Sequence, residues 1–355
     1  MAKRKAAILG SSGMIGQRFA CMLRSHPYFD VVAYCASDRS DGKTMSEVWK
    51  LSDVEIDRDL GSNVIRSTEA AALVKEGVEL VFSGLPSDVA GRIEDDCAEN
   101  GIAVFSNAAS HRMESDTPII IPEVNAEHLA SVEAQKKRRK KGGFVVTNAN
   151  CSITGLVLGL KPLVDLWEFT EVDVATYQAL SGAGYPGVPS MDILGNVIPF
   201  IKNEEDKMRA EGKKILGSYG PNGFKDSPVD IAASCSRVHV RDGHLEAVFV
   251  RGRDLPSEKE VTKALEGFKA KPQKLKLPSA PEQPIIVLRE ANRPQPLIDA
   301  LAGWPERAKG MAVSIGRIRA EKDVLRFYLL SHNTIRGGAG GSVLNAELAY
   351  KEGVM

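Results

Sequence analysis

The sequence has few cysteines, no long apolar run and no excess of either charge. Its 355 residues include five cysteines, an odd number, and none of them forms a CxxC pair. This pattern argues against a disulfide framework and a zinc site, and it favours a reducing compartment. No apolar stretch approaches the roughly 20 residues that a membrane-spanning helix needs, and the N-terminus has no signal-peptide pattern. We therefore expect a cytoplasmic protein without a bound metal.

Balanced charge restricts the class of partner. Lys and Arg together number 46, as do Asp and Glu, so no overall field attracts nucleic acid or an anionic membrane. The basic run from Lys136 to Lys141 is typical of the solvated end of a helix that begins near Glu127. We expect a small-molecule substrate, no nucleic acid and no membrane. An anionic substrate then needs a local basic site.

Residues 1–150 alternate between apolar strands and helices, which predicts an α/β domain with a parallel sheet and helices on both faces. The expected strands are Lys5–Leu9, Val31–Ala36, Glu79–Ser83 and Ile102–Ser106. One expected helix follows the first strand and runs to about Ser25, and another covers Ser87–Asn100. A chain of this length favours two domains.

Beyond residue 150 the pattern predicts a mixed sheet with helices on one face. The expected strands are Glu171–Leu180, Ala233–Val240, His244–Val250 and Val324–Leu330, and the expected helices are Ile193–Glu211 and Ser257–Phe268, with a loop or edge strand over Lys271–Pro284. Gly337–Gly341 precedes a final helix that we expect to pack on the first domain. We therefore assign residues 1–150, completed by 335–355, to one domain and 151–334 to the other.

A glycine-rich loop joins the first strand to the first helix. Small residues there let backbone N–H groups approach a pyrophosphate, so the loop predicts a Rossmann-type dinucleotide site. Its expected cofactor contacts are Gly10, Ser11, Ser12, Gly13, Met14, Ile15 and Gly16. The second strand runs into Ser37-Asp38-Arg39-Ser40, where Arg39 is suited to a 2′-phosphate. We therefore favour NADP as the cofactor, with Asp38 turned away.

Cys151 stands between the apolar strand Phe144–Thr147 and an apolar-faced helix. The unpaired N–H groups and positive dipole end of a helix start favour an anion, and the thiolate is the nucleophilic form of cysteine. Cys151 is therefore a candidate nucleophile, although a small buried cysteine is the commoner case.

Other polar residues offer partners for this thiol. Gln178 lies on the expected strand Glu171–Leu180, ahead of the loop Ser181-Gly182-Ala183-Gly184, and it is either a core amide or a group that orients a substrate or a bound water. Among six histidines, His244 stands at a turn-to-strand corner and has the pKa range for proton transfer. Arg112 and Arg237 are candidate anion ligands. Glu204 and Lys207, three apart on an expected helix, form an acid–base pair that is more often a surface ion pair.

Together these segments resemble the archaeal and fungal branch of the aspartate-β-semialdehyde dehydrogenase family over essentially the whole chain. The most specific matches are Asn150-Cys151-Ser152, Gln178, and Arg237 seven positions before His244. The resemblance implies a dinucleotide-binding domain, a catalytic and dimerisation domain, and homodimers or homotetramers. It also implies a role in the biosynthesis of lysine, threonine, methionine and diaminopimelate.

The resemblance assigns roles to individual residues. Cys151 is the expected nucleophile, His244 the acid/base and Gln178 an orienting group. Arg237 is expected to bind the substrate carboxylate and Glu204, or the adjacent Glu205, its amino group. Arg112 and Lys207 match phosphate-binding positions, with Asn107 nearby. Further expected cofactor contacts are Ser37, Arg39, Ser40, Ser83, Ser181, Gly182 and Asn333.

The implied reaction is the NADPH-dependent reduction of aspartyl 4-phosphate to aspartate 4-semialdehyde through a thioester on Cys151. Backbone N–H groups at the start of the Cys151 helix are expected to stabilise the oxyanion. Three alternatives remain: a malonyl-CoA reductase of the same fold, the more distant N-acetyl-glutamyl-phosphate reductases, and a non-catalytic NADP-binding regulator.

Overall fold

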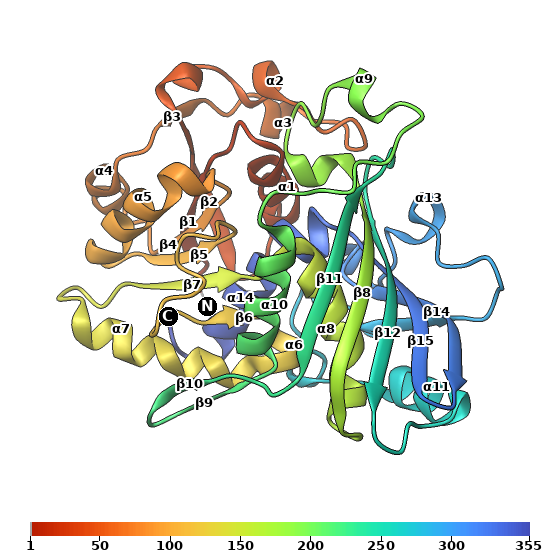
Figure 1. Cartoon of the computed structure of the whole chain (residues 1–355). Helices are drawn as coiled ribbons and strands as arrows, with labels where there is room; N and C mark the ends of the chain where they lie inside the picture. Colours follow the sequence, from red (N-terminus) through yellow and green to blue (C-terminus); the bar gives the residue numbers. More distant parts are fainter. Residues whose placement is uncertain (1) are drawn as a thin grey trace. The chain divides into compact units, whose positions relative to one another are not determined.

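The computed structural model describes residues 2–355, which divide into two compact units. The first unit contains residues 2–120, 127–148 and 338–355, and the second contains 121–126 and 149–337. Figure 1 shows the elements of both units coloured along the chain. The candidate active-site residues from Cys151 to His244 all belong to the second unit.

The first unit is built on a seven-stranded sheet in the order β3-β2-β1-β4-β5-β7-β6, in which every neighbouring pair is parallel. Its strands are β1 Arg4–Leu9, β2 Phe29–Ala36, β3 Ile65–Ser67, β4 Leu80–Ser83, β5 Ala103–Ser106, β6 Ile119–Ile120 and β7 Phe144–Asn148. Its helices are α1 Met14–Leu23, α2 Met45–Val48, α3 Arg58–Gly61, α4 Ala70–Lys75, α5 Ser87–Glu99, α7 Val132–Arg138 and α14 Gly340–Lys351.

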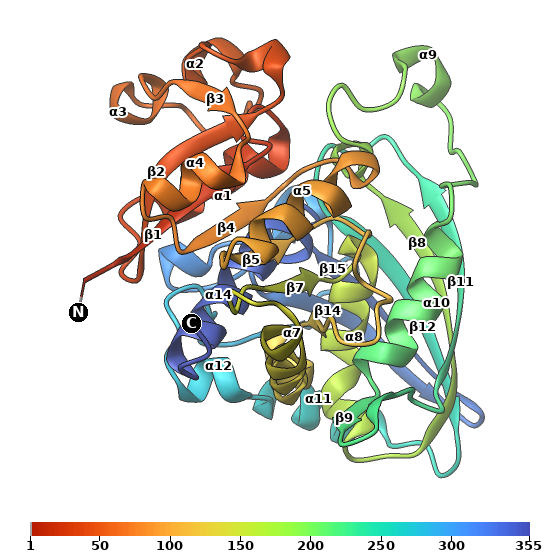
Figure 2. The ribbon, with the colours of Figure 1, turned by 90° about the vertical axis from the view of Figure 1, so that its left-hand side faces the viewer.

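Alternation along the strands explains why helices cover both faces of this sheet. Ala7 and Leu9 pack into a buried cluster with residues of α4 and α5, and Figure 2 shows these two helices side by side. On the opposite face an aromatic cluster forms around Phe82, whose ring centroid lies 5.3 Å from that of Phe19 in α1. The parallel, doubly covered sheet confirms the expected fold class.

The second unit contains a six-stranded mixed sheet in the order β11-β8-β12-β15-β14-β13. Its strands are β8 Phe169–Gln178, β11 Asp230–Arg237, β12 His244–Gly252, β13 Ile285–Leu288, β14 Val313–Glu321 and β15 Val324–Ser331, and β9 Ser218–Gly220 pairs separately with β10 Gly223–Lys225. Its helices are α6 Pro122–Asn125, α8 Cys151–Val164, α9 Ser190–Ile193, α10 Glu204–Ile215, α11 Glu258–Gly267, α12 Lys271–Lys274 and α13 Pro296–Asp299. Figure 1 shows α8 and α10 on the same side of the long strands β11, β8 and β12.

Several expected boundaries in this unit are wrong. The helix expected from Ile193 begins at Glu204, because Gly195 and Pro199 interrupt the preceding segment and only the short α9 forms before them. Strand β11 runs from Asp230 to Arg237, three residues earlier than expected. The segment Lys271–Pro284 contains α12, and the sequence reasoning missed β13 and β14.

Among residues 2–355, no helix combines the length and apolar character that a membrane crossing requires. Within the same range, no group of three or more His, Cys, Asp or Glu side chains is arranged to hold a metal ion.

Glu246 is an unusual member of the second unit's core. It lies on β12 opposite Thr176 of β8, is fully buried, and neither carboxyl oxygen has a hydrogen-bond partner. Burial, with a further contribution from Glu204, raises the pKa of Glu246 well above its ordinary value. An unpartnered buried polar group costs free energy.

We therefore expect Glu246→Met to stabilise the protein at pH 7 by about 1–3 kcal/mol, because it replaces an unpartnered carboxyl group with an apolar side chain of similar volume. The folded-state pKa is raised, so the cost of Glu246 appears as pH rises above the unfolded value, and the gain should shrink toward pH 4.5. Urea unfolding at several pH values measures both effects, with the exposed Glu282→Met as control. A loss of stability at pH 7 would show that the carboxyl group has a stabilising partner.

Candidate active site

Three strands bring polar side chains to one end of the second unit's sheet. Gln178 and Arg237 are the last residues of the parallel neighbours β8 and β11 and are paired in register. His244 is the first residue of β12, which runs antiparallel to β8 and pairs Leu245 with Tyr177. The carboxyl ends of two strands and the amino end of a third therefore coincide. The strand pairing gathers residues that are up to 66 positions apart in the sequence (244 − 178).

Cys151 is the first residue of α8, as expected, but the N–H groups behind it are not unpaired. Asn150 caps the helix, and its Oδ1 accepts hydrogen bonds from the backbone N–H groups of Ser152 (2.9 Å) and Ile153 (3.2 Å). The expectation that free N–H groups at this helix start stabilise an anion is therefore wrong for these two residues. Asparagine is a preferred capping residue because its side-chain oxygen satisfies such donors.

The sulfur of Cys151 lies 3.2 Å from Nε2 of His244. The backbone N–H of Ala179 donates to the other ring nitrogen, Nδ1, over 3.1 Å. A nitrogen that accepts a hydrogen bond carries no proton, so the proton of the neutral ring stands on Nε2 and faces the sulfur. In this arrangement His244 presents a hydrogen-bond donor to Cys151.

The surroundings of His244 favour the neutral ring. Burial, followed by the positive charge of Arg237 and the proximity of His332, lowers the pKa of His244 to about 3. Arg237 is itself buried, which lowers its pKa, while Cys151 and Glu204 counteract that effect. Its Nη1 donates to the carbonyl oxygen of Ala179 over 2.7 Å. A fixed positive charge thus lies close to the thiol and the carboxylate.

Glu204 joins the thiol's neighbours into a network. Its Oε1 accepts hydrogen bonds from Nε2 of Gln178 (2.8 Å) and Nδ2 of Asn150 (3.0 Å). Gln178 also donates to Oγ of Ser152 over 2.6 Å. The adjacent Glu205 points elsewhere, because its carboxylate accepts the backbone N–H of Cys235 in β11. Of the two glutamates, only Glu204 is placed beside the candidate catalytic residues.

The other expected residues of this unit lie on nearby segments. Lys207 is half-buried one turn after Glu204 on α10. Gly182 lies against the site so closely that a Cβ there would come within 2.8 Å of Arg237 and 3.0 Å of His244. Asn333 is buried and bridges two loops, since its Nδ2 donates to Oγ of Ser181 and its Oδ1 accepts the N–H of Gly243. This bridge holds the turn that precedes His244.

In the first unit, the glycine-rich loop fits a phosphate group. Helix α1 starts after Gly13 without a side-chain cap and without an acidic residue in its first turn. A Cβ at Gly16 would lie 2.2 Å from the carbonyl oxygen of Gly10, so only glycine allows this close turn. An uncapped helix start with a glycine approach is a suitable cradle for a pyrophosphate. At the end of β2, Ser37, Asp38 and Arg39 are all exposed, and Ser40 is half-buried.

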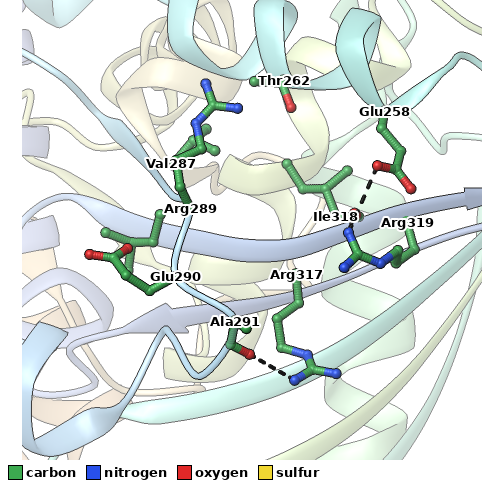
Figure 3. Close-up of a pocket in the computed structure, with 10 residues that line it drawn as sticks. Glu258, Thr262, Val287, Arg289, Glu290, Ala291, Arg317, Ile318 and Arg319 are labelled. Carbon is green, nitrogen blue, oxygen red and sulfur yellow. Dashed lines mark hydrogen bonds and ion pairs between the residues drawn. The ribbon is translucent and has the colours of Figure 1, made fainter.

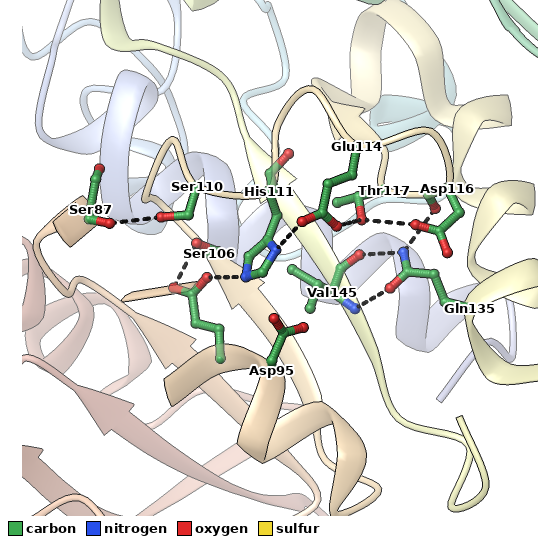
Figure 4. A network of polar contacts seen from close by, with 12 residues as sticks. Ser87, Asp95, Ser106, Ser110, His111, Glu114, Asp116, Thr117, Gln135 and Val145 are labelled. Carbon is green, nitrogen blue, oxygen red and sulfur yellow. Dashed lines mark hydrogen bonds and ion pairs between the residues drawn. The ribbon is translucent and has the colours of Figure 1, made fainter. Parts of the chain in front are cut away.

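Asn107 and Arg112 flank a loop that is fixed by buried polar contacts of the first unit. Arg112 donates to the carbonyl oxygens of Asn148 (2.9 Å) and Asn107 (2.8 Å). Nδ2 of Asn107 donates to Oγ of Ser342 in α14. Beside Arg112, His111 contacts Glu114 through Nδ1 (2.8 Å) and Glu94 through Nε2 (3.5 Å) (Figure 4). The buried Ser83 at the end of β4 completes the expected residues of this unit.

From the sequence, Asn150 and Ser152 were recognised only as motif positions, and Glu211 was not identified. Oε2 of Glu211 accepts the backbone N–H of Asn150 over 2.7 Å. The signal was available, because Glu204 and Glu211 are seven residues apart and share one face of α10. The misplaced start of that helix obscured it.

A separate hollow of about 250 Å³ lies between α11, β13 and β14 and contains none of the expected site residues. Its arginines have partners close by (Figure 3): Arg319 pairs with Glu258 at 3.8 Å, and Nη1 of Arg317 donates to the carbonyl oxygen of Ala291 over 2.8 Å. The candidate reacting groups lie outside this hollow, at the end of the sheet.

Comparison with known proteins gives two family matches. Residues 5–132 match the NAD binding domain of semialdehyde dehydrogenases, and residues 160–336 match the dimerisation domain of the same family.

Individual relatives match along almost the whole chain. An aspartate-semialdehyde dehydrogenase of Methanothermobacter thermautotrophicus is 46% identical, with 96% of this chain and 97% of that protein covered. The crystal structure of aspartate semialdehyde dehydrogenase with NADP from Candida albicans matches with a TM-score of 0.89 at 38% identity, and it covers 100% of both chains. A malonyl CoA reductase (NADP) of Metallosphaera sedula is 37% identical over 98% of this chain and 97% of its own length.

The depressed pKa of His244 predicts a specific pH dependence of stability. The ring takes up a proton near pH 6.5 in the unfolded chain but only near pH 3 in the folded protein, so acidification favours unfolding between these values. Between pH 7 and pH 5 this linkage should remove about 2 kcal/mol. Urea unfolding of the wild type and His244→Asn should therefore diverge by that amount, with His239→Asn, at an exposed histidine of the same unit, as the control. Parallel curves for wild type and His244→Asn would refute the low pKa.

Proposed function

We propose a catalytic function for this chain, which belongs to the aspartate-semialdehyde dehydrogenase family: it reduces aspartyl 4-phosphate to aspartate 4-semialdehyde with NADPH, in a reversible reaction that releases phosphate. The observation that carries this proposal is the 3.2 Å contact between the sulfur of Cys151 and Nε2 of His244. A thiol beside a proton-bearing imidazole, with Arg237 close by, has the composition of a site for covalent acyl transfer.

In the first step, the thiolate of Cys151 attacks the carbonyl carbon of the acyl phosphate. A C–S bond forms, the C–O bond to phosphate breaks, and phosphate leaves with the electron pair of that bond. The product is a thioester on Cys151. A positive charge at Arg237 and the Nε2–H of His244 both favour negative charge on the sulfur before attack.

Reduction releases the product from the thiol. When bound, the nicotinamide cofactor supplies a hydride to the thioester carbonyl. The resulting alkoxide collapses to the aldehyde, the C–S bond breaks, and the electron pair returns to the sulfur. His244 assists this step, because its Nε2–H faces the sulfur on which negative charge develops.

We assign substrate contacts to charged groups around the thiol. Arg237 has the planar donor fork that binds a carboxylate through two hydrogen bonds, and Glu204 supplies a negative charge for the amino group. In the same proposal Arg112, Lys207 and Asn107 bind phosphate oxygens.

We assign the cofactor to the first unit, with the pyrophosphate at the uncapped start of α1 and Arg39 at the 2′-phosphate. The exposed Arg39 at the end of β2 supports NADP, the cofactor in the similar Candida albicans structure. Ser37, Ser40, Ser83, Ser181, Gly182 and Asn333 are the further proposed contacts.

We also propose that the protein is a cytoplasmic homodimer or homotetramer. None of the five cysteines, all within residues 2–355, forms a disulfide, which fits a reducing compartment. The face of β8, β12 and β15 opposite α8 presents Tyr177, Leu245, Phe249 and Tyr328 at least partly exposed. The match to a dimerisation domain supports contact between two copies.

The activity test uses purified protein with aspartate semialdehyde, phosphate and NADP, and it follows the absorbance of reduced cofactor. Cys151→Ala should lower the rate by on the order of 10⁴-fold or more, because no thioester can form, while cofactor affinity stays within about twofold. Cys21→Ser is the control, since burial raises the pKa of that thiol to about 11. Turnover of malonyl-CoA in place of aspartate semialdehyde would overturn the proposed substrate.

Cofactor choice is tested at the end of β2. Arg39→Ala should weaken NADP binding by about 10- to 100-fold through loss of charge-assisted hydrogen bonds, and it should change NAD binding little. Arg58→Ala, at an exposed arginine of α3 in the same unit, provides the matched control. Titration of cofactor fluorescence measures both constants, and equal losses for the two cofactors would exclude the 2′-phosphate role.

A further inference from the structure

We infer that Glu211 and Glu204 act as positioning residues for Cys151, because these two carboxylates of α10 hold the capping residue from which the nucleophile's helix begins. The inference rests on the proposed function in one respect, namely that Cys151 is the nucleophile. It gives Glu204 a second role beside contact with the substrate's amino group, and it gives Glu211 a role in the reaction.

Every polar group of Asn150 takes part in a hydrogen bond. Its backbone N–H donates to Oε2 of Glu211 over 2.7 Å, and its side-chain Nδ2 donates to Oε1 of Glu204 over 3.0 Å. Its Oδ1 caps α8, and its carbonyl oxygen accepts hydrogen bonds from the backbone N–H (3.0 Å) and the Oγ1 (2.8 Å) of Thr154. A residue fixed at all four groups cannot rotate independently of its partners. The direction of the next residue, Cys151, is therefore fixed with it.

The two carboxylates are placed by close helix packing. Helix α10 packs against α8 and β11, and a Cβ at Gly212 would come within 2.4 Å of Ile231 and 3.3 Å of Ile153. This close approach puts the face of α10 that carries Glu204 and Glu211 against the start of α8. Glu211 is only 2% exposed and Glu204 only 6%. Burial of two carboxylates is costly unless they accept hydrogen bonds.

Glu204 connects this clamp to the rest of the site. The same Oε1 that accepts Asn150 also accepts Nε2 of Gln178, and Oγ of Ser152 lies 3.5 Å away. Removal of this oxygen would release the helix cap and the orienting amide together. Removal of Glu211 would release the backbone N–H of Asn150 but leave the contact between the Asn150 side chain and Glu204 in place. The two residues should therefore give different kinetic signatures.

The first test measures the reactivity of Cys151 without any substrate. Glu211→Ala should slow alkylation of Cys151 by iodoacetamide and should lower kcat by about 10- to 100-fold, since a displaced nucleophile loses its alignment. The KM values for aspartate semialdehyde and NADP should stay within about twofold. Glu211→Gln keeps an acceptor oxygen for Asn150 and should restore most of both rates. Mass spectrometry of the Cys151 peptide identifies the alkylated thiol.

The second test separates the two roles of Glu204. Glu204→Gln retains an acceptor oxygen but loses the charge, so it should raise the KM for aspartate semialdehyde and leave the alkylation rate nearly unchanged. Glu204→Ala should impair both. Asp206→Asn removes a charge from the same first turn of α10 at an exposed position and serves as the control.

A third test exchanges the hydrogen-bond donor and acceptor between residues 150 and 204, so it does not depend on truncated side chains. Asn150→Asp keeps the capping oxygen but places a carboxylate against Glu204, so alkylation should slow. Adding Glu204→Gln supplies an N–H donor to that carboxylate and should restore the alkylation rate of the single variant toward wild type. Circular dichroism and thermal unfolding verify that each variant is folded.

The outcomes distinguish this inference from the proposed function. Wild-type alkylation and kcat in folded Glu211→Ala, or failure of the donor–acceptor exchange to restore reactivity, would overturn the positioning roles. Absence of aspartate semialdehyde turnover in the wild type would overturn the proposed function, while the alkylation measurements would still test the clamp.

Discussion

Burial of polar groups at one end of the second unit's sheet is the constraint on which the candidate active site depends. A buried polar group without a partner is costly, and the candidate reacting groups here take defined neighbours. The N–H of Ala179 selects the tautomer of His244, its carbonyl oxygen binds Arg237, and Glu204 collects Gln178 and Asn150. Because these contacts share partners, the site is a single network and not a set of independent side chains.

The two helix starts that the sequence singled out are used in opposite ways. Helix α1 has no side-chain cap, which leaves its first N–H groups open to an anionic ligand. Helix α8 is capped by Asn150, so two of its first N–H groups donate to the Asn150 side chain and hold the chain in place. The start of a helix thus suits α1 for binding an anion and α8 for holding Cys151 in place. The single residue before each helix, Gly13 or Asn150, makes the difference.

The order of strands and helices was largely predictable, because apolar periodicity depends on neighbours in the sequence. The parallel sheet of the first unit, the mixed sheet of the second and the helix that begins at Cys151 were all expected, and the structure has them. The predicted elements and boundaries were wrong where the local sequence signals are weak. Strand β14 includes Gly316 and exposed arginines, and the start of α10 at Glu204 follows an irregular segment without a side-chain cap.

The sequence by itself determined which candidate reacting groups the chain contains. Cys151, Gln178, Arg237 and His244 were identified from residue type, local position and resemblance to a family. Only the tertiary structure decided what state each group is in and what holds it. The proton position on His244 depends on Ala179, and the capping of Cys151's helix depends on Glu204 and Glu211. These contacts join residues between 54 and 65 positions apart, and no local pattern in the sequence encodes them.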